Sequence, residues 1–157
     1  MPLSPSTLAS ALEQQWLATE GGSLPDSAMQ SGDRFAGAVA SWFGMAMAAG
    51  FPCSTASVRR SQLMSAAAAA LQARNAQVAG QQLGLAVASY MAGQLFGAGV
   101  ASFPVAASVM SMEFGAVFAD LDLPVSARAQ RMAAACMTAA VSTMVVFPPP
   151  MPPAPVS

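Results

Sequence analysis

Three apolar runs of this chain end in the same dipeptide, Phe-Pro. These sites are Phe51-Pro52, Phe103-Pro104 and Phe147-Pro148. Aligned on them, the chain falls into three segments that cover about residues 8–52, 63–104 and 109–148. Each segment has a shorter helical stretch, a loop, and a longer stretch of small residues before the Phe-Pro. Repeats of this length usually build arrays in which neighbouring units bury each other's apolar faces. The recurrence therefore predicts one domain built from three diverged copies of a helical hairpin.

Short local matches between the segments favour the same interpretation. The alternative is that an alanine-rich composition produces chance matches, but two of the three pairs involve more than alanine. The pairs are AVASW at 38–42 with AVASY at 86–90, SLPDSA at 23–28 with DLPVSA at 122–127, and RFAGA at 34–38 with RMAAA at 131–135.

The residues between these sites predict an all-α fold. Ala, Met, Leu, Gln and Arg dominate, and all are good helix formers. Valines are mostly isolated, without the period-two alternation of strands. Each Phe-Pro is expected to end the second helix of its hairpin, because the residue before proline is disfavoured in the α region. The Phe would then fold back as an apolar plug. Residues 148–157 are expected to form an extended, proline-rich arm of polyproline II type that reaches a neighbouring subunit.

The composition predicts a surface that is largely covered. Hydrophobic residues make up 55% of the chain and charged residues only 8%, against about 25% charged in an ordinary soluble domain. The formal net charge is -1, and the chain has no histidine. Nearly neutral proteins with apolar surfaces tend to associate. We therefore expect either a homo-oligomer with further protein partners or contact with lipid.

Few residues could support binding of nucleic acid, or catalysis. Arg59-Arg60 is the only local basic cluster, and a pair that is solvated or caps a helix explains it more simply than phosphate binding does. Without histidine, the commonest general base is missing. Asp120 and Asp122 lack further oxygen ligands at the spacing of a metal site. The glycine-rich stretch at 93–99 lacks the Lys-Ser/Thr of a phosphate loop. We expect no catalytic residue, cofactor, metal or nucleic-acid partner.

The two cysteines, Cys53 and Cys136, form no metal-binding motif. Free thiols are the default interpretation, and the sequence leaves a single disulfide open.

A membrane protein is the alternative. Residues 35–58, 75–112 and 132–157 carry no charge, and each stretch exceeds the roughly 20 residues that a span needs. The alternative is thus a small, holin-like integral protein of a host inner membrane, with up to three short spans. Ala and Gly contribute little to insertion, however, and arginines lie on both sides of every candidate span. A third hypothesis, a soluble helical adaptor for a partner peptide, needs a polar face that so few charges hardly supply.

Small residues in the second helices would allow close helix packing, with large side chains at intervals. Trp42 and Tyr90 either fill the core or anchor an interface between repeats or subunits. The candidates for packing or interface contacts are Trp42, Phe51, Pro52, Tyr90, Phe103, Pro104, Phe147 and Pro148.

Two of these segments carry a resemblance. Phe35–Trp42 and Leu85–Tyr90 share small residues, a β-branched residue and a closing aromatic. This pattern resembles the second helix of small helical structural proteins of tailed-bacteriophage virions, encoded among tail and neck genes. The third copy, Met132–Ala140, departs from it, since it lacks the aromatic and has Cys136. The resemblance implies a non-enzymatic virion component (neck, tail or capsid-associated) that packs among identical or partner subunits.

Overall fold

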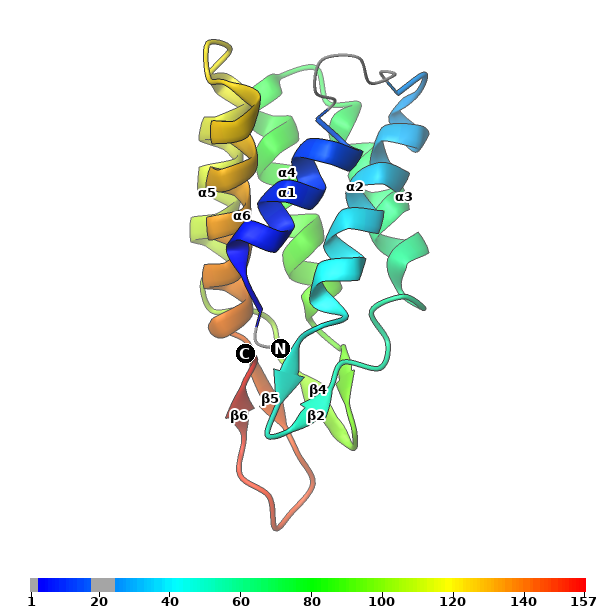
Figure 1. Cartoon of the computed structure of the whole chain (residues 1–157), viewed down its shortest axis with the longest axis vertical. Helices are drawn as coiled ribbons and strands as arrows, with labels where there is room; N and C mark the ends of the chain where they lie inside the picture. Colours follow the sequence, from blue (N-terminus) through cyan, green and yellow to red (C-terminus); the bar gives the residue numbers. More distant parts are fainter. Residues whose placement is uncertain (1–2, 18–24) are drawn as a thin grey trace.

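The structure is a computed structural model that describes residues 3–17 and 25–157 of the chain. Within these residues the order helix, helix, strand, strand recurs three times (Figure 1). The helices are α1 (Pro5–Gln15), α2 (Ala28–Phe43), α3 (Arg60–Leu71), α4 (Ala76–Met91), α5 (Ala107–Ala119) and α6 (Val125–Val141). The strands are β1 (Met47–Ala48), β2 (Phe51–Pro52), β3 (Leu95–Phe96), β4 (Gly99–Ala101), β5 (Met144–Val146) and β6 (Ala154–Pro155).

Local capping chemistry places the starts of the second helices. The side chain of Ser27 accepts a hydrogen bond from the N–H of Gln30, and Asn75 accepts one from Val78, each over 3.1 Å. Such caps satisfy backbone donors that the first turn of a helix leaves free. The match between 23–28 and 122–127 lies at corresponding loops before α2 and α6, but Ser23 and Leu24 fall outside the described residues.

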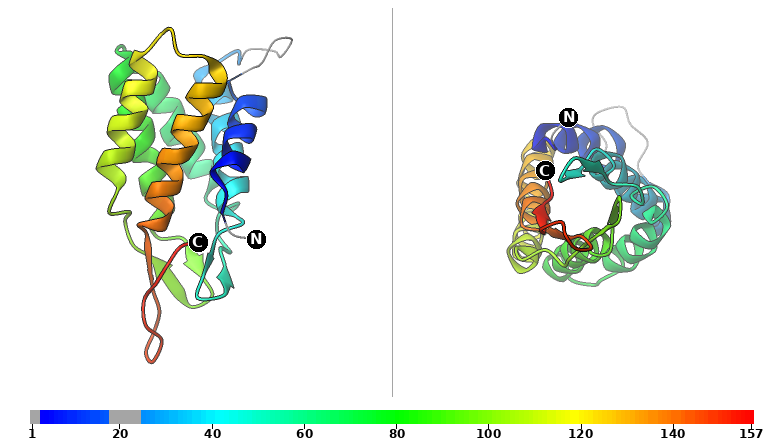
Figure 2. Two further views of the ribbon diagram at one scale, coloured as in Figure 1. Left: turned by 60° about the vertical axis from the view of Figure 1, so that its left-hand side comes forward. Right: turned by 90° about the horizontal axis from the view of Figure 1, so that it is seen from below.

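The six helices of the described chain form a closed ring. Neighbours in sequence pack side by side, and α6 packs against α1 to complete the circle (Figure 2, right). The second helices point equivalent residues into the centre. Phe35, Leu83 and Met132 are each the eighth residue of their helix, and all three are fully buried. The core therefore lies inside the ring and is shared by all three repeats.

The short strands close one end of this ring. β1 pairs with β2, and β3, β4, β5 and β6 pair in that order, always antiparallel. Cys53 bridges to Phe96, which joins β2 to β3. Ser157 and Met47 exchange two N–H···O bonds of 2.9 Å, which joins the end of the chain to β1. The strands thus form a continuous circuit at one end of the molecule, seen below the helices in Figure 1.

The prediction of an all-α fold is wrong, because two small antiparallel sheets accompany the helices. Their strands are only two or three residues long, too short for period-two alternation to be visible in the sequence. The turns rely on positive φ angles, at Gly50 (85°) in the first hairpin and Gly97 (59°) in the second. Glycine adopts such angles without steric cost. Glycines that favoured close helix contact in the sequence therefore also make hairpin turns.

The Phe-Pro sites do not end the second helices. Those helices end at Phe43, Met91 and Val141, and the first Phe-Pro lies in strand β2, beyond a hairpin turn. The second site follows β4 and the third follows β5, so the three occupy different places in their repeats. The dipeptide aligned the segments only approximately, because its spacing from the helices differs from one repeat to another.

The free polyproline arm is also wrong. The end of the chain folds back as β6, whose Ala154 pairs with Val145 of β5. Val156 is 1% exposed, and its N–H donates to the carbonyl of Thr143 over 3.0 Å. Ala154 and Val156 alternate with Pro155, so the residue without an N–H donor stands between two that have one. Only the loop from 148 to 153 is proline-rich and exposed.

Candidate interaction surfaces

The eight candidate residues divide into a buried set and an exposed set. Phe51 and Phe103 are 39% and 51% exposed, so neither is an apolar plug. The buried candidates are Trp42, Tyr90, Pro104 and Phe147, and the exposed ones are Phe51, Pro52, Phe103 and Pro148.

Trp42 belongs to the interior of the ring. Its ring is 1% exposed and lies 6.0 Å from that of Phe43, centroid to centroid. Its indole Nε1–H donates to the carbonyl oxygen of Ser4 over 2.9 Å. This bond ties the end of α2 to the start of α1. Of the two interpretations that the sequence left open for Trp42, the structure places it in the core of its own chain.

Tyr90 anchors a buried polar junction between the first and second repeats. Its hydroxyl donates to the carbonyl oxygen of Ala56 over 2.6 Å. Gln94 is fully buried; its amide nitrogen donates to the Tyr90 carbonyl over 2.9 Å and its oxygen accepts from the Thr55 hydroxyl over 2.6 Å. The Thr55 oxygen in turn accepts from the N–H of Leu95 over 3.0 Å. These bonds fix β3 against the loop after β2.

Burial governs the titration of this junction. Desolvation raises the pKa of the Tyr90 hydroxyl well above its usual range, and also raises the pKa of the Cys53 thiol. Burial favours the neutral form of both groups. Cys53 and Cys136 are both free and buried, so the question of a disulfide is resolved in favour of thiols.

The Arg59-Arg60 pair makes contacts within the chain. Arg59 Nη1 donates to the carbonyl oxygens of Tyr90 and Ala92, at the end of α4, where a cation complements the helix dipole. Arg60 forms an exposed ion pair with Asp33 of α2, with 2.5 Å between Nη2 and Oδ1. The structure thus gives both arginines the capping and surface contacts that the sequence suggested.

The strand-bearing end of the molecule combines exposed apolar side chains with an absence of charge. It is built from the uncharged stretches of the sequence that follow α2, α4 and α6. On the outer face of the four-stranded sheet, Leu95 pairs with Val100, and Val100 pairs with Val146. These three side chains form one exposed row across three strands. Other exposed apolar residues in these segments are Phe51, Phe103, Met144 and Met151.

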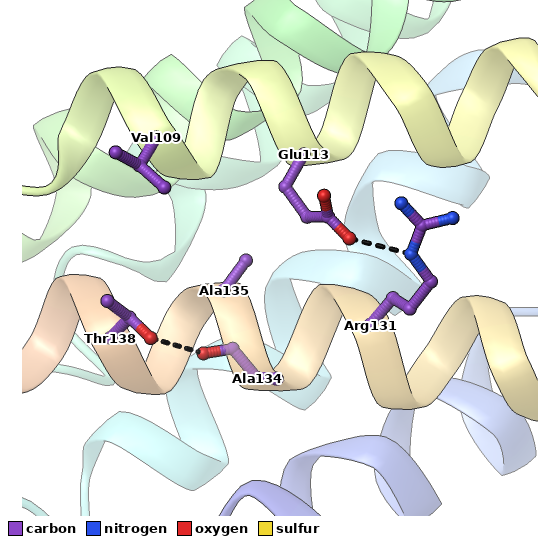
Figure 3. Close-up of a pocket in the computed structure, with 6 residues that line it drawn as sticks. All are labelled: Val109, Glu113, Arg131, Ala134, Ala135 and Thr138. Atoms are coloured by element: carbon purple, nitrogen blue, oxygen red, sulfur yellow. Dashed lines mark hydrogen bonds and ion pairs between the residues drawn. The ribbon is translucent and has the colours of Figure 1, made fainter.

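A second surface is a groove between α5 and α6 with a volume of 270 Å³ (Figure 3). At one end Arg131 Nε donates to Glu113 Oε1 over 2.6 Å, and this hydrogen bond raises the pKa of Arg131. The rest of the groove is floored by small side chains. Its lining residues are Val109, Glu113, Arg131, Ala134, Ala135 and Thr138.

The sequence analysis missed this groove and the apolar face of α5 beside it. Val105, Val109 and Met112 are 83%, 59% and 69% exposed. Their spacing of four and three residues places them on one side of the helix. A signal was available, because α5 is apolar around its whole circumference, which is typical of a helix covered on all sides.

The acidic and glycine-rich motifs have local roles. The Oδ1 of Asp120 accepts from the N–H of Asp122 over 3.2 Å in the loop after α5. The stretch at 93–99 forms the turn from β3 to β4. Among the described residues, no group of His, Cys, Asp and Glu side chains is arranged to hold a metal ion. None of the described helices is both long enough and apolar enough to cross a membrane.

Alkaline pH should destabilise the fold through Cys136. Burial raises the pKa of this thiol from 9.0 to about 12. The unfolded chain releases the proton first, so the stabilisation is complete below pH 9 and is lost as pH rises toward about 12. Cys136 is the twelfth residue of α6, where α2 and α4 have Val39 and Val87. We expect Cys136→Val to lose less unfolding free energy than the wild type between neutral and strongly alkaline pH, measured by urea titration. Equal losses in both proteins would contradict this.

Comparison with family models, with curated proteins and with solved structures found no match to this chain. The functional inference therefore rests on the surfaces described above and on the resemblance in α2 and α4.

Proposed function

We propose that this chain is a non-enzymatic structural assembly protein, a component of a phage virion that forms a homo-oligomer and contacts other virion proteins. The observation that carries the proposal is the uncharged, strand-bearing end with its exposed row of Leu95, Val100 and Val146. The inner face of the same sheet contributes Phe96 and Val145 to the core. A sheet with apolar side chains on both faces is typical of one that is covered on both sides.

The energetics favour protein contact at this end. Burying apolar surface contributes roughly 25 cal/mol per Å², and no charged side chain of these segments would have to lose its hydration. The strands already pair in a circuit, so an incoming strand is not the expected partner. Association through side chains on the outer face is what this surface supports.

The virion setting rests on the resemblance alone. Its two motifs lie in α2 and α4, where their closing aromatics, Trp42 and Tyr90, are buried in the interior of the chain. The motif therefore describes how such a helix packs within a subunit. It supports membership of that structural class, while the surfaces carry the proposal of assembly.

The proposal predicts self-association in water that depends on the strand-bearing end. The double variant Val100→Lys/Val146→Glu places opposite charges on a directly paired position, which the isolated sheet tolerates. The same charges in an apolar contact would be desolvated. We expect the wild type to sediment as a discrete oligomer and the variant to dissociate at least about tenfold more readily, equivalent to ~1.4 kcal/mol. Sedimentation equilibrium over a range of concentrations measures both.

A matched control adds the same two charges elsewhere. Ser65→Glu/Ala69→Lys introduces an i, i+4 pair on the exposed face of α3. It should leave the oligomer mass unchanged. A wild-type chain that stays monomeric at every concentration would reject the proposed function.

A further inference from the structure

The three first helices of the repeats expose equivalent positions of very different polarity. Their fourth residues, Leu8, Leu63 and Met110, are all buried, so the helices have the same rotation about their axes. The third, sixth and tenth residues are exposed in each helix. These residues are Thr7, Ser10 and Gln14 in α1, Gln62, Ser65 and Ala69 in α3, and Val109, Met112 and Ala116 in α5.

The chain therefore contains its own comparison. Where α1 and α3 present hydroxyl and amide groups to solvent, α5 presents Val109 and Met112, which are 59% and 69% exposed. Position in the ring does not demand this difference, because the other two helices meet the same geometry with polar residues. An exposed apolar stripe confined to one repeat marks a surface that another molecule covers.

We propose that the surface formed by α5 and α6 binds the same surface of a second copy of this chain, across a two-fold axis. The inference rests on the proposed assembly function and names one of its interfaces. In a two-fold contact, every residue that meets a partner residue also receives the reciprocal contact. A surface suited to this must therefore be complementary to itself in shape and in charge.

The shape meets this requirement. Met112 and Val109 form a ridge on α5, and the groove beside it is floored by Ala134 and Ala135 of α6 (Figure 3). A two-fold rotation lays the ridge of each copy over the groove of the other. Met112 suits this role, because methionine is unbranched and adapts to irregular gaps.

The charges meet it too. The groove lining includes one acidic and one basic residue, Glu113 and Arg131, which lie side by side. Rotation about a two-fold axis reverses their order, so the carboxylate of each copy faces the guanidinium of the other. A partner surface of a single sign would instead repel one member of the pair. This complementarity favours a second copy over an acidic or a basic partner.

The first test replaces the α5 ridge with its counterparts from α3. Val109→Gln/Met112→Ser gives α5 the third and sixth residues of α3, at positions exposed enough to leave the fold intact. The control is Val58→Gln, which changes a valine that is 74% exposed and lies outside this surface. Sedimentation equilibrium should show the double variant dissociating at least about tenfold more readily, with the control unchanged. Circular dichroism melting checks that all three proteins are folded.

The second test asks whether the partner is the same surface of another copy. Glu113→Arg alone places two cations in the two-fold contact, and Arg131→Glu alone places two anions there. Each variant should associate at least about tenfold more weakly than the wild type. Mixed in equal amounts, they should form heterodimers, because each contact then joins opposite charges again. Native mass spectrometry distinguishes the two chains by mass.

The outcomes separate this inference from the proposed function. If the wild type associates and the ridge variant associates equally well, this interface is wrong while assembly stands. If the single charge variants weaken association but their mixture does not restore it, the two-fold arrangement is wrong. A monomeric wild type would reject the assembly function itself.

Discussion

Replacing Trp42 with alanine should lower the free energy of unfolding by about 3–5 kcal/mol, among the largest effects of a single core substitution. The indole is 1% exposed, so its removal leaves a cavity that the surrounding helices fill only in part. The change also removes the hydrogen bond from Nε1 to Ser4, which fixes the start of α1 to the end of α2. Urea denaturation followed by circular dichroism measures the loss.

Two controls separate burial from the other terms. Trp42→Phe keeps much of the apolar volume but removes the donor, so we expect a smaller loss than for alanine. Phe103→Ala removes an aromatic that is 51% exposed, and its effect on unfolding should be well below that of Trp42→Ala. If Trp42→Ala melted like the wild type, the assignment of Trp42 to the core would be wrong.

Gly80→Ala should destabilise the protein by about 1–3 kcal/mol, although alanine is the better helix former. A Cβ at Gly80 would meet the carbonyl oxygen of Phe114 and lie 2.9 Å from the Cα of Gly115, both backbone atoms of α5. Backbone in a packed helix cannot turn aside as a side chain can. The added methyl must therefore push α4 and α5 apart along their contact.

Gly37→Ala is the matched control, with the opposite expected sign. It makes the same change inside α2, but its Cβ would meet only the Arg60 side chain, at 3.4 Å or more. Replacing an unconstrained helical glycine gains about 0.5–1 kcal/mol. Thermal or urea unfolding of both variants in parallel tests the pair. Equal effects of the same sign would show that close approach of α4 and α5 does not decide the cost.

The same position controls packing in each repeat. Gly32, Gly80 and Ala129 are the fifth residues of α2, α4 and α6. A Cβ at Gly32 would lie 2.7 Å from the carbonyl oxygen of Met64 in α3, so two of the three junctions between repeats require glycine. Small residues in the second helices were correctly expected to permit close packing. Which of them stand at a junction could be seen only once the neighbouring helix was in place.

The sequence predicted the helical segments well, because their residue types and caps act locally. Ser27 and Asn75 cap helices where the sequence suggested loops, and Trp42 and Tyr90 stood out as large residues among small ones. The strands were missed for a physical reason. Two or three residues cannot display a period, and their pairing depends on residues far away in the chain, as with Val145 and Ala154 or Met47 and Ser157.

The candidate surfaces divide in the same way. The uncharged stretches that form the strand-bearing end are visible in the sequence, and they favoured an exposed apolar surface from the start. The face of α5 was not recognised, because exposure depends on how the ring turns each helix. Val109 and Met110 are neighbours of similar polarity, yet one is 59% exposed and the other 1%.

By itself, the sequence determined the helical segments, the shortage of charge and the apolar character that favours association, since these follow from residue type and local spacing. Tertiary structure alone decided that the three repeats close into a ring, that the end of the chain becomes a strand beside β5, and that Phe51 and Phe103 lie outside while Phe147 lies inside. Ring closure requires α6 to meet α1 and Ser157 to meet Met47. Such contacts depend on the packing of the whole chain, which no local pattern encodes.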